Sequence, residues 1–316
     1  MRVMGNSEFR TFEQLCGLSQ AGVKRTVSTY LKSKYPKVIE TKEYIYAEGT
    51  IPIALCAHMD TVFKSPPSEV YYDRQKNVIF SPMGLGADDR AGVYAILQII
   101  KRGLRPHIIF TTDEEIGAAG AAKLSEIDCP FEGLRYIIEL DRRGANDCVF
   151  YDCDNFEFVK YVEQFGFVET FGSFSDISLI CPAWKVAGVN LSVGYRDEHS
   201  VSEVLFVGHL LDTIDKVINM LNAEDNTVFE YIPCKYNGWY KYVYGYNNDK
   251  CDCCNKEFSA SELIPVKKGD FTFKNYCVDC ISDEKVQWCK CCGEAYLKGK
   301  KDIGLCEDCT YDFGYN

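Results

Sequence analysis

The chain has 316 residues, a length that suits one large α/β domain together with a smaller module. Its composition, with 47% hydrophobic and 26% charged residues, is ordinary for a soluble globular protein, and it contains no apolar run long enough to span a membrane. The formal net charge of −11 argues against nucleic acid or an anionic membrane surface as the main partner.

Helical and strand patterns alternate along most of the chain. Apolar spacing predicts a helix over residues 8–33, and EYIYAEG and IPIALCAH are predicted to pair as a hairpin around Gly49. Two more helices are predicted, from Asp89 to Lys101 and from about Ser202 to Leu221. Further strands are predicted, in chain order, at NVIF (77–80), HIIFTT (107–112), YIIEL (136–140), CVFY (148–151) and WKVAGV (184–189). This alternation predicts an α/β fold with a mixed, mostly parallel sheet and helices on both faces.

The cysteines divide the chain near residue 245. Ten of the 17 cysteines lie between Cys251 and Cys309. The N-terminal residues MRVMGNSEFRTFEQL lack the apolar core of a secretion signal, so we expect a cytoplasmic protein in a reducing compartment. Clustered thiols then indicate zinc rather than disulfides.

Polar clusters follow several of the predicted strands, at the edge where parallel sheets collect their chemistry. They are AHMDTV with His58 and Asp60, GLGADDRAG with Asp88 and Asp89, TTDEEIG (111–117), IIELDRRG with Asp141, and YRDEHS with His199. Each alone has an ordinary explanation, such as a hydrogen-bonded core histidine or a helix cap. Together, His, Asp and Glu side chains suit zinc or a related divalent ion.

The TTDEEIG segment places Asp113, Glu114 and Glu115 side by side at a strand end. Three adjacent, partly desolvated carboxylates repel one another, so this segment requires a compensating cation.

The order HMDTV, GADDRAG, DEEIGAAGA, a strand-end Asp and a late His resembles the di-zinc exopeptidase superfamily, which includes peptidase T and the single-domain leucyl-type aminopeptidases. The resemblance covers residues 50 to 205. It implies one zinc bound by His58 and Asp141, a second bound by Glu115 and His199, and Asp88 bridging the two. It also implies a cis peptide between Asp88 and Asp89.

The resemblance leaves two carboxylates free for other work. Asp60 would orient the His58 ring through its second nitrogen. Glu114 would be the general base that takes a proton from a water bridging the two zinc ions. Glu139 is a weaker alternative to Asp141, because its place inside IIEL is taken to put it on the opposite strand face.

Two further residues are substrate-binding candidates. Asp176, in a stretch that resembles the family's Ser-Asp segment, is predicted to bind a substrate amine or to cap a turn. Tyr195 is a candidate to stabilise charge on the tetrahedral intermediate, with a packing role as the alternative. Only 57 residues separate Asp141 from His199, so we expect no inserted lid domain.

The tail contains two copies of a unit headed CxCC and closed by CxDC. Two tandem zinc sites with four cysteine ligands each, resembling a double zinc ribbon, are predicted: Cys251, Cys254, Cys277 and Cys280 in the first, and Cys289, Cys292, Cys306 and Cys309 in the second. Cys253 and Cys291 are alternative ligands. A cross-braced pairing, of the first CxxC pair with the third and the second with the fourth, is the alternative to the sequential units that the repeat favours. Residues 251–316 hold nine Lys, no Arg and twelve acidic residues, which favours a protein partner over nucleic acid.

The sequence therefore predicts a metallopeptidase domain over 1–245 and a zinc-binding module over 246–316. The expected activity is that of a two-zinc aminopeptidase on short peptides. A deacylase or carboxypeptidase acting on N-acyl amino acids is the alternative within the enzyme class. A non-catalytic scaffold with an interaction tail is the alternative outside it.

Overall fold

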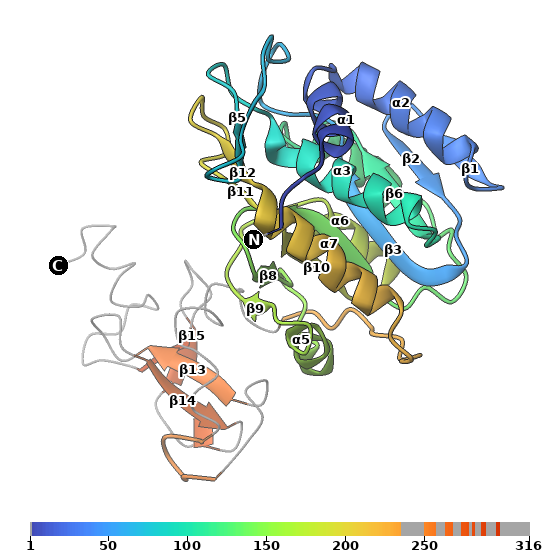
Figure 1. Cartoon of the computed structure of the whole chain (residues 1–316). Helices are drawn as coiled ribbons and strands as arrows, with labels where there is room; N and C mark the ends of the chain where they lie inside the picture. The colour runs from blue at the N-terminus through green and yellow to red at the C-terminus, as the bar shows by residue number, and fades with distance from the viewer. Residues whose placement is uncertain are drawn as a thin grey trace. The chain divides into compact units, whose positions relative to one another are not determined.

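A computed structural model describes residues 2–234, followed by 250–256, 263–267, 273–277, 280–281, 286–288 and 295–297. The chain divides into two compact units, Met1–Pro233 and Cys234–Asn316 (Figure 1). The predicted boundary at residue 245 lies outside the described residues. Within the described part of the chain, no helix is long and apolar enough to cross a membrane.

An eight-stranded sheet forms the centre of the first unit. In spatial order its strands are β1 (Val38–Glu40), β2 (Tyr44–Ala47), β6 (Pro106–Thr111), β3 (Ile51–His58), β7 (Ile137–Arg142), β10 (Gly188–Ser192), β8 (Asp147–Val149) and β9 (Val168–Glu169). The four central strands β6, β3, β7 and β10 are parallel, and antiparallel neighbours flank them on both sides. The carboxyl ends of the central strands therefore meet at one edge of the sheet.

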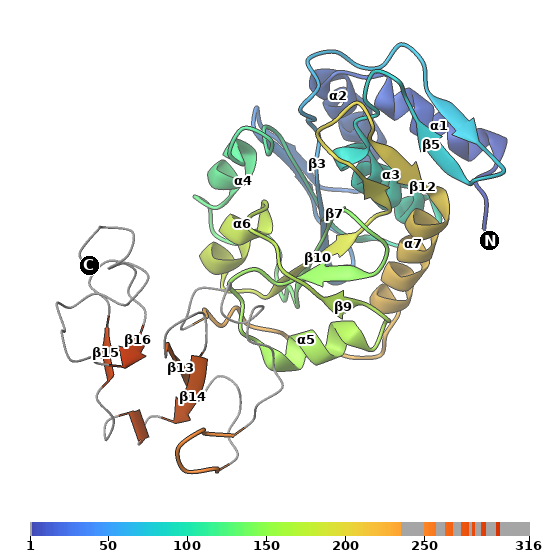
Figure 2. The same cartoon turned by 90° about the vertical axis from the view of Figure 1, so that its left-hand side faces the viewer.

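Helices cover both faces of this sheet (Figures 1 and 2). One face packs against α3 (Ala87–Lys101) and α7 (Val207–Leu221), with α1 (Asn6–Cys16), α2 (Gln20–Lys32) and α5 (Phe156–Glu163) in the same apolar cluster. The other face packs against α4 (Ala119–Leu124) and α6 (Ile177–Trp184). The predicted mixed, mostly parallel sheet with helices on both faces is confirmed.

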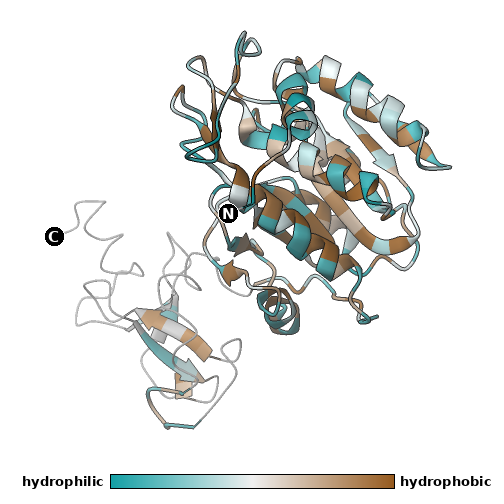
Figure 3. Ribbon diagram, in the orientation of Figure 1, coloured by the Kyte–Doolittle hydropathy of each residue, from teal (hydrophilic) through white to brown (hydrophobic). Residues whose placement is uncertain are grey.

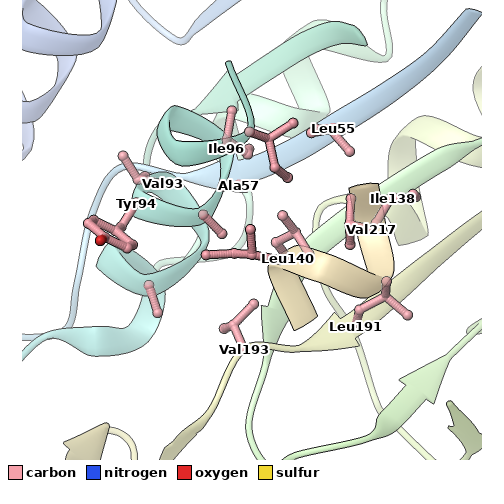
Figure 4. Packing of buried hydrophobic residues seen from close by; sticks show 14 of the residues in the cluster. Leu55, Ala57, Val93, Tyr94, Ile96, Ile138, Leu140, Leu191, Val193 and Val217 are labelled. Atoms are coloured by element: carbon pink, nitrogen blue, oxygen red, sulfur yellow. The ribbon is translucent and has the colours of Figure 1, made fainter. Parts of the chain in front are cut away.

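Alternation along the central strands sorts their side chains between the two faces. Apolar residues dominate these strands (Figure 3). Leu55 and Ala57 of β3, and Ile138 and Leu140 of β7, lie in the cluster with α3 and α7 (Figure 4). Their neighbours one position away, such as Cys56 and Ile137, face α4 and α6. Because the side-chain period is two, His58 lies on the α4 and α6 face with Cys56.

A second, smaller antiparallel sheet lies beside the first. Its order is β11 (Tyr195–Arg196), β12 (Val204–Phe206), β5 (Val78–Phe80) and β4 (Tyr71–Asp73). The connection between β11 and β12 carries His199.

The helix predicted over residues 8–33 is wrong, because α1 and α2 are separate helices. Gly17 ends α1, and Ser19 starts α2 by accepting a hydrogen bond from the backbone N–H of Gly22 at 3.3 Å. Arg90 donates to the carbonyl oxygens of Leu15 and Leu18, both at 3.2 Å. A side chain distant in sequence thus supplies hydrogen bonds to carbonyl groups left free where α1 ends.

The predicted hairpin of residues 43–58 is also wrong. β2 and β3 are not neighbours, because β6 lies between them and pairs with both. The link passes across the start of β6, where the N–H groups of Thr50 and Ile51 donate to the carbonyl of Arg105 at 2.8 and 3.0 Å. A Cβ at Gly49 would lie 2.2 Å from that same oxygen, which explains the glycine.

Two other boundaries differ from the predicted ones. The helix predicted from Ser202 begins at Val207, because Val204 to Phe206 pair with β5 and β11 as strand β12. The strand predicted at 184–189 begins at Gly188, because α6 continues to Trp184 and ends on Lys185 in the left-handed region at φ 56°.

The second unit contains a four-stranded sheet in its described residues. The strands, in spatial order, are β14 (Phe273–Cys277), β13 (Leu263–Lys267), β16 (Ala295–Leu297) and β15 (Val286–Trp288).

Candidate metal centre

His58, the last residue of β3, is 1% exposed and contacts three carboxylates. Its Nδ1 lies 3.2 Å from Asp60 Oδ1, and its Nε2 lies 3.0 Å from Asp88 Oδ1 and 3.4 Å from Asp141 Oδ1. Asp141 is in β7, the strand that neighbours β3 in the sheet. One ring nitrogen therefore faces two carboxylates, while the other is held by Asp60.

Asp88 lies at the start of α3 and joins this group to a second one. Its Oδ2 lies 3.2 Å from His199 Nε2, and His199 Nε2 lies 3.0 Å from Glu115 Oε2. The predicted cis peptide between Asp88 and Asp89 is confirmed. The structure thus brings together two sets of three ligand-type side chains, His58, Asp88 and Asp141 in one, and Asp88, Glu115 and His199 in the other.

The donor sets fit divalent metal ions. Within each set the ligand atoms lie within 4.8 Å of one another, and the imidazole and carboxylate donors are those of zinc sites. Glu115 Oε1 is buried without a hydrogen-bond partner among the described residues. Burial, together with the neighbouring Asp88, raises the pKa of Glu115 to about 7 and that of Asp141 to about 6. These carboxylates are short of positive charge, which a cation would supply.

Asp60 connects the histidine to the loop after β6. Its two carboxylate oxygens accept the backbone N–H groups of Glu114 and Glu115, each at 3.1 Å. Burial opposes the charged form of Asp60, but His58 and these two amides outweigh it and lower the Asp60 pKa. One carboxylate therefore sets both the orientation of His58 and the position of the two glutamates.

Glu114 lies beside the two ligand sets but belongs to neither. Burial raises the pKa of Glu114 to about 8 in the metal-free chain. His58 opposes this shift, while the charges of Asp141, Asp176 and Glu115 add to it.

Asp113 has a different role from its neighbours. Its Oδ1 accepts Gln20 Nε2 at 3.0 Å, and its N–H donates to Gln20 Oε1 at 3.3 Å, so it ties the loop to α2.

Asp141 is held by three polar neighbours. Tyr195 donates to its Oδ1 and Ser175 to its Oδ2, both at 3.1 Å, and Asn190 donates to its backbone carbonyl at 2.9 Å. The Tyr195 hydroxyl, a predicted substrate contact, is thus directed at Asp141 in this structure.

Asp176 and Glu139 lie deeper in the molecule. Asp176 is fully buried at the start of α6 and makes no capping hydrogen bond, accepting instead from the Thr111 hydroxyl. The expectation that Glu139 faces the opposite side of its strand is wrong. Positions 139 and 141 are two apart and share a face, and both side chains hydrogen-bond Ser175.

Two residues near the site were missed at the level of sequence. Glu203, fully buried, accepts the N–H groups of Gly86 and Asp88 at 2.5 and 3.0 Å and so holds the loop that carries the shared aspartate. Arg90 donates to the carbonyls of Met59 and Asp60 at 2.7 and 3.1 Å. Two features of the sequence could have indicated them. Arg90 is the charged residue that follows the two aspartates in DDRAG, and Glu203 directly precedes the apolar run VLF.

A cleft of about 610 Å³ opens beside the centre. It is bounded by the turn between α1 and α2 and by the segments after β3 and β6, and its lining includes Thr61, Phe63, Lys64, Glu115 and Ile116.

In the second unit, Cys251, Cys254, Cys277 and Cys280 bring their sulfur atoms within 4.8 Å of one another. The backbone N–H of Cys277 donates to Cys251 Sγ at 3.3 Å, and such backbone hydrogen bonds outweigh burial and lower the pKa of Cys251 to about 6. Cys253 is exposed. The cysteines of the second predicted site, Cys289, Cys292, Cys306 and Cys309, and the alternative ligand Cys291 lie outside the described residues.

Comparison with solved structures shows that other proteins share the fold of the first unit, with its central parallel sheet. A tripeptidase from Staphylococcus aureus superposes with a TM-score of 0.58 at 15% identity, covering 68% of this chain and 96% of its own. The aminopeptidase PepT from Bacillus cereus superposes with a TM-score of 0.53 at 16% identity, covering 68% of this chain and 97% of its own. An aminopeptidase from the archaeon Desulfurococcus kamchatkensis superposes with a TM-score of 0.55 at 15% identity, covering 70% of this chain and 96% of its own.

No protein-family model and no curated protein matches the sequence. At these identities the likeness defines the fold of the chain and not its chemistry.

Proposed function

We propose that the first unit is a two-metal aminopeptidase that acts on short peptides. The observation that carries the proposal is the pair of ligand sets sharing Asp88, with Glu114 beside both and bound into neither. The fold shared with a tripeptidase and two aminopeptidases supports the same class of reaction.

His58, Asp88 and Asp141 would hold one metal ion, and Asp88, Glu115 and His199 the other. Zinc is the usual metal for such ligands, and two divalent ions supply positive charge that polarises the scissile carbonyl and acidifies water. Asp60 keeps the His58 ring oriented through Nδ1.

Glu114 is the proposed general base. Its carboxylate takes the proton from the attacking water and passes it to the leaving nitrogen as the amide bond breaks. The backbone N–H of Glu114 donates to Asp60, and this hydrogen bond holds the proposed base next to Glu115, a proposed metal ligand. Adjacent residues then have separate functions, which accounts for the crowding of carboxylates in TTDEEIG.

Within the proposed domain of residues 1–245 we infer no lid inserted between Asp141 and His199, a stretch that the structure describes throughout. Between Asp141 and His199 the chain forms β8, α5, β9, α6, β10 and β11, all within the first unit. The cleft beside the centre would then admit short peptides directly.

For residues 246–316 we propose two structural zinc sites and a protein partner. The converging sulfurs of Cys251, Cys254, Cys277 and Cys280 support the first site. The second rests on the repeated spacing alone. A cytoplasmic location would keep these thiols reduced.

Replacing Glu114 with Gln tests the function. Hydrolysis of aminoacyl amides and tripeptides should fall about 10²–10⁴-fold, while metal content, measured by mass spectrometry, stays that of the unaltered protein. Glu126→Gln, a change on an exposed carboxylate at the end of α4, is the matched control and should have no effect.

Unchanged activity in Glu114→Gln would refute the assigned base. Cleavage of N-acyl amino acids without cleavage of free-amine peptides would favour a deacylase or carboxypeptidase. If nothing in a broad panel is cleaved by metal-loaded protein, the scaffold alternative holds.

A further inference from the structure

Three more ligand-type side chains converge deeper in the sheet, next to the metal centre. Cys56 lies two residues before His58 on β3, and Glu139 lies two residues before Asp141 on β7. The two strands pair Cys56 directly with Glu139, and Asp176 approaches from the start of α6. The sulfur and one oxygen from each carboxylate lie within 4.8 Å of one another.

All three side chains are removed from solvent. Cys56 and Asp176 are 0% exposed and Glu139 is 1% exposed. Asp176 accepts one hydrogen bond, from Thr111, and Glu139 is hydrogen-bonded to Ser175. The remaining oxygens, Asp176 Oδ1 and Glu139 Oε2, have no hydrogen-bond partner among the described residues.

Neither Glu139 nor Asp176 has a Lys or Arg partner in the described part of the chain. His58 opposes the negative charge of Asp176, but its ring already faces Asp60, Asp88 and Asp141. Asp141 adds further negative charge beside both Glu139 and Asp176. Burying an unpaired carboxylate is costly, and burying two together is more so, unless a proton or a cation offsets the charge.

We propose that Cys56, Glu139 and Asp176 bind a third divalent metal ion of the zinc type, distinct from the two at the proposed catalytic centre. A thiolate among the ligands favours zinc over magnesium or calcium, which prefer oxygen alone. Binding releases the thiol proton and any carboxyl protons to solvent as the sulfur and oxygens become ligands. The ion would join β3, β7 and α6 directly behind His58 and Asp141.

This site does not depend on peptide hydrolysis, so its test uses no activity. The full chain is loaded with ¹¹³Cd²⁺ and examined by ¹¹³Cd NMR, in which the resonance moves downfield with each thiolate ligand. The proposed tail sites with four sulfur ligands should give the most downfield chemical shifts. The proposed catalytic sites, with only nitrogen and oxygen ligands, should give the most upfield ones. We expect an additional resonance between these two extremes, from a site with one thiolate.

Cys56→Ala should abolish this intermediate resonance and lower bound cadmium by one equivalent. Cys181→Ala is the matched control, because Cys181 is also buried on this face but lies outside the cluster, and it should leave the resonance in place. Asp176→Asn preserves side-chain volume and should also lose the resonance, which guards against misfolding of the cysteine variant.

Two results would overturn the assignment. The first is a spectrum of the unaltered protein with no resonance between the extremes, which would mean that protons alone neutralise the buried carboxylates. The second is an intermediate resonance that persists in both Cys56→Ala and Asp176→Asn.

Discussion

At the scale of single residues, Asp60 links three parts of the proposed centre. Its carboxylate contacts His58 Nδ1 and accepts the backbone N–H groups of Glu114 and Glu115. Asp60 thus helps to position the proposed ligands His58 and Glu115 and the proposed base Glu114, although it belongs to neither ligand set.

Replacing Asp60 with Asn should therefore weaken metal binding by about 10–100-fold. The amide has a single acceptor oxygen, so it cannot accept from both glutamate N–H groups and also fix the imidazole. Competition with a chromophoric chelator measures the affinity. Asp113→Asn, which alters a neighbouring carboxylate bonded to Gln20, should leave metal affinity unchanged, and equal losses in both variants would contradict the argument.

The stability of the metal-free protein should fall as pH rises. Burial raises the folded-state pKa of Glu115 to about 7 and of Glu114 to about 8, above the ordinary glutamate value of 4.5. The hydrogen bond to Asp88 raises the pKa of His199 to about 9, above the ordinary histidine value of 6.5. All three groups hold protons more tightly in the folded state, so their stabilising contribution is lost as pH rises through these values.

Thermal melts of chelator-treated protein at about pH 6 and about pH 9 measure this effect, and the melting temperature should be lower at the higher pH. Metal-loaded protein should not show the decrease, because metal binding requires the deprotonated ligands and becomes stronger as pH rises. A metal-free protein that is more stable at the higher pH would contradict the assigned charges.

At the level of secondary-structure elements, the contact between α3 and β7 sets the distance between Asp88 and Asp141. Gly92 permits this contact, since a Cβ at this position would lie 2.0 Å from the carbonyl oxygen of Leu140 and 2.6 Å from the Asp89 carboxylate. Both obstacles are buried, so the helix would have to move away from the strand.

Gly92→Ala should consequently lower the free energy of unfolding by roughly 1–3 kcal/mol or more and also weaken metal binding. Urea denaturation and chelator competition measure the two effects. Gly17→Ala is the control, because a Cβ there makes an ordinary contact of 3.5 Å with a backbone oxygen and the residue has a φ of −73°. A stable Gly92→Ala variant with unaltered metal affinity would show that α3 shifts without consequence.

At the scale of the whole molecule, the two units have separate apolar clusters. The first unit has cores on both faces of its sheet, whereas the described residues of the second contain small clusters around Leu263 and Val266. The proposed zinc at Cys251, Cys254, Cys277 and Cys280 would supply part of the folding free energy of this unit.

Replacing Cys251 and Cys254 together with Ser should remove one equivalent of bound zinc. It should also abolish any melting transition of the second unit while leaving that of the first unit in place, since these cysteines belong to the second unit. Metal analysis and calorimetry check both outcomes. A full complement of zinc in the double variant would refute this ligand set, and Cys253→Ser is the control for an exposed thiol nearby.

Much of this organisation was accessible from spacing along the chain. The apolar stripe of α3, the buried strands β3, β6 and β7, and the polar residues that follow them were predicted from local patterns, because the side-chain period of a helix or a strand is a local property. The order of the motifs indicated a resemblance from which the fold and the proposed residues of the centre were predicted.

Tertiary structure decided what depends on contacts between distant segments. The insertion of β6 between β2 and β3, the division of residues 8–33 by Arg90, and the support of Asp88 by Glu203 each join residues far apart in sequence. The grouping of Cys56, Glu139 and Asp176 is of the same kind, since it arises where two parallel strands and a helix meet. Local patterns predict which face of an element is buried, whereas the partner on the other side of that face is set by the packing of the whole chain.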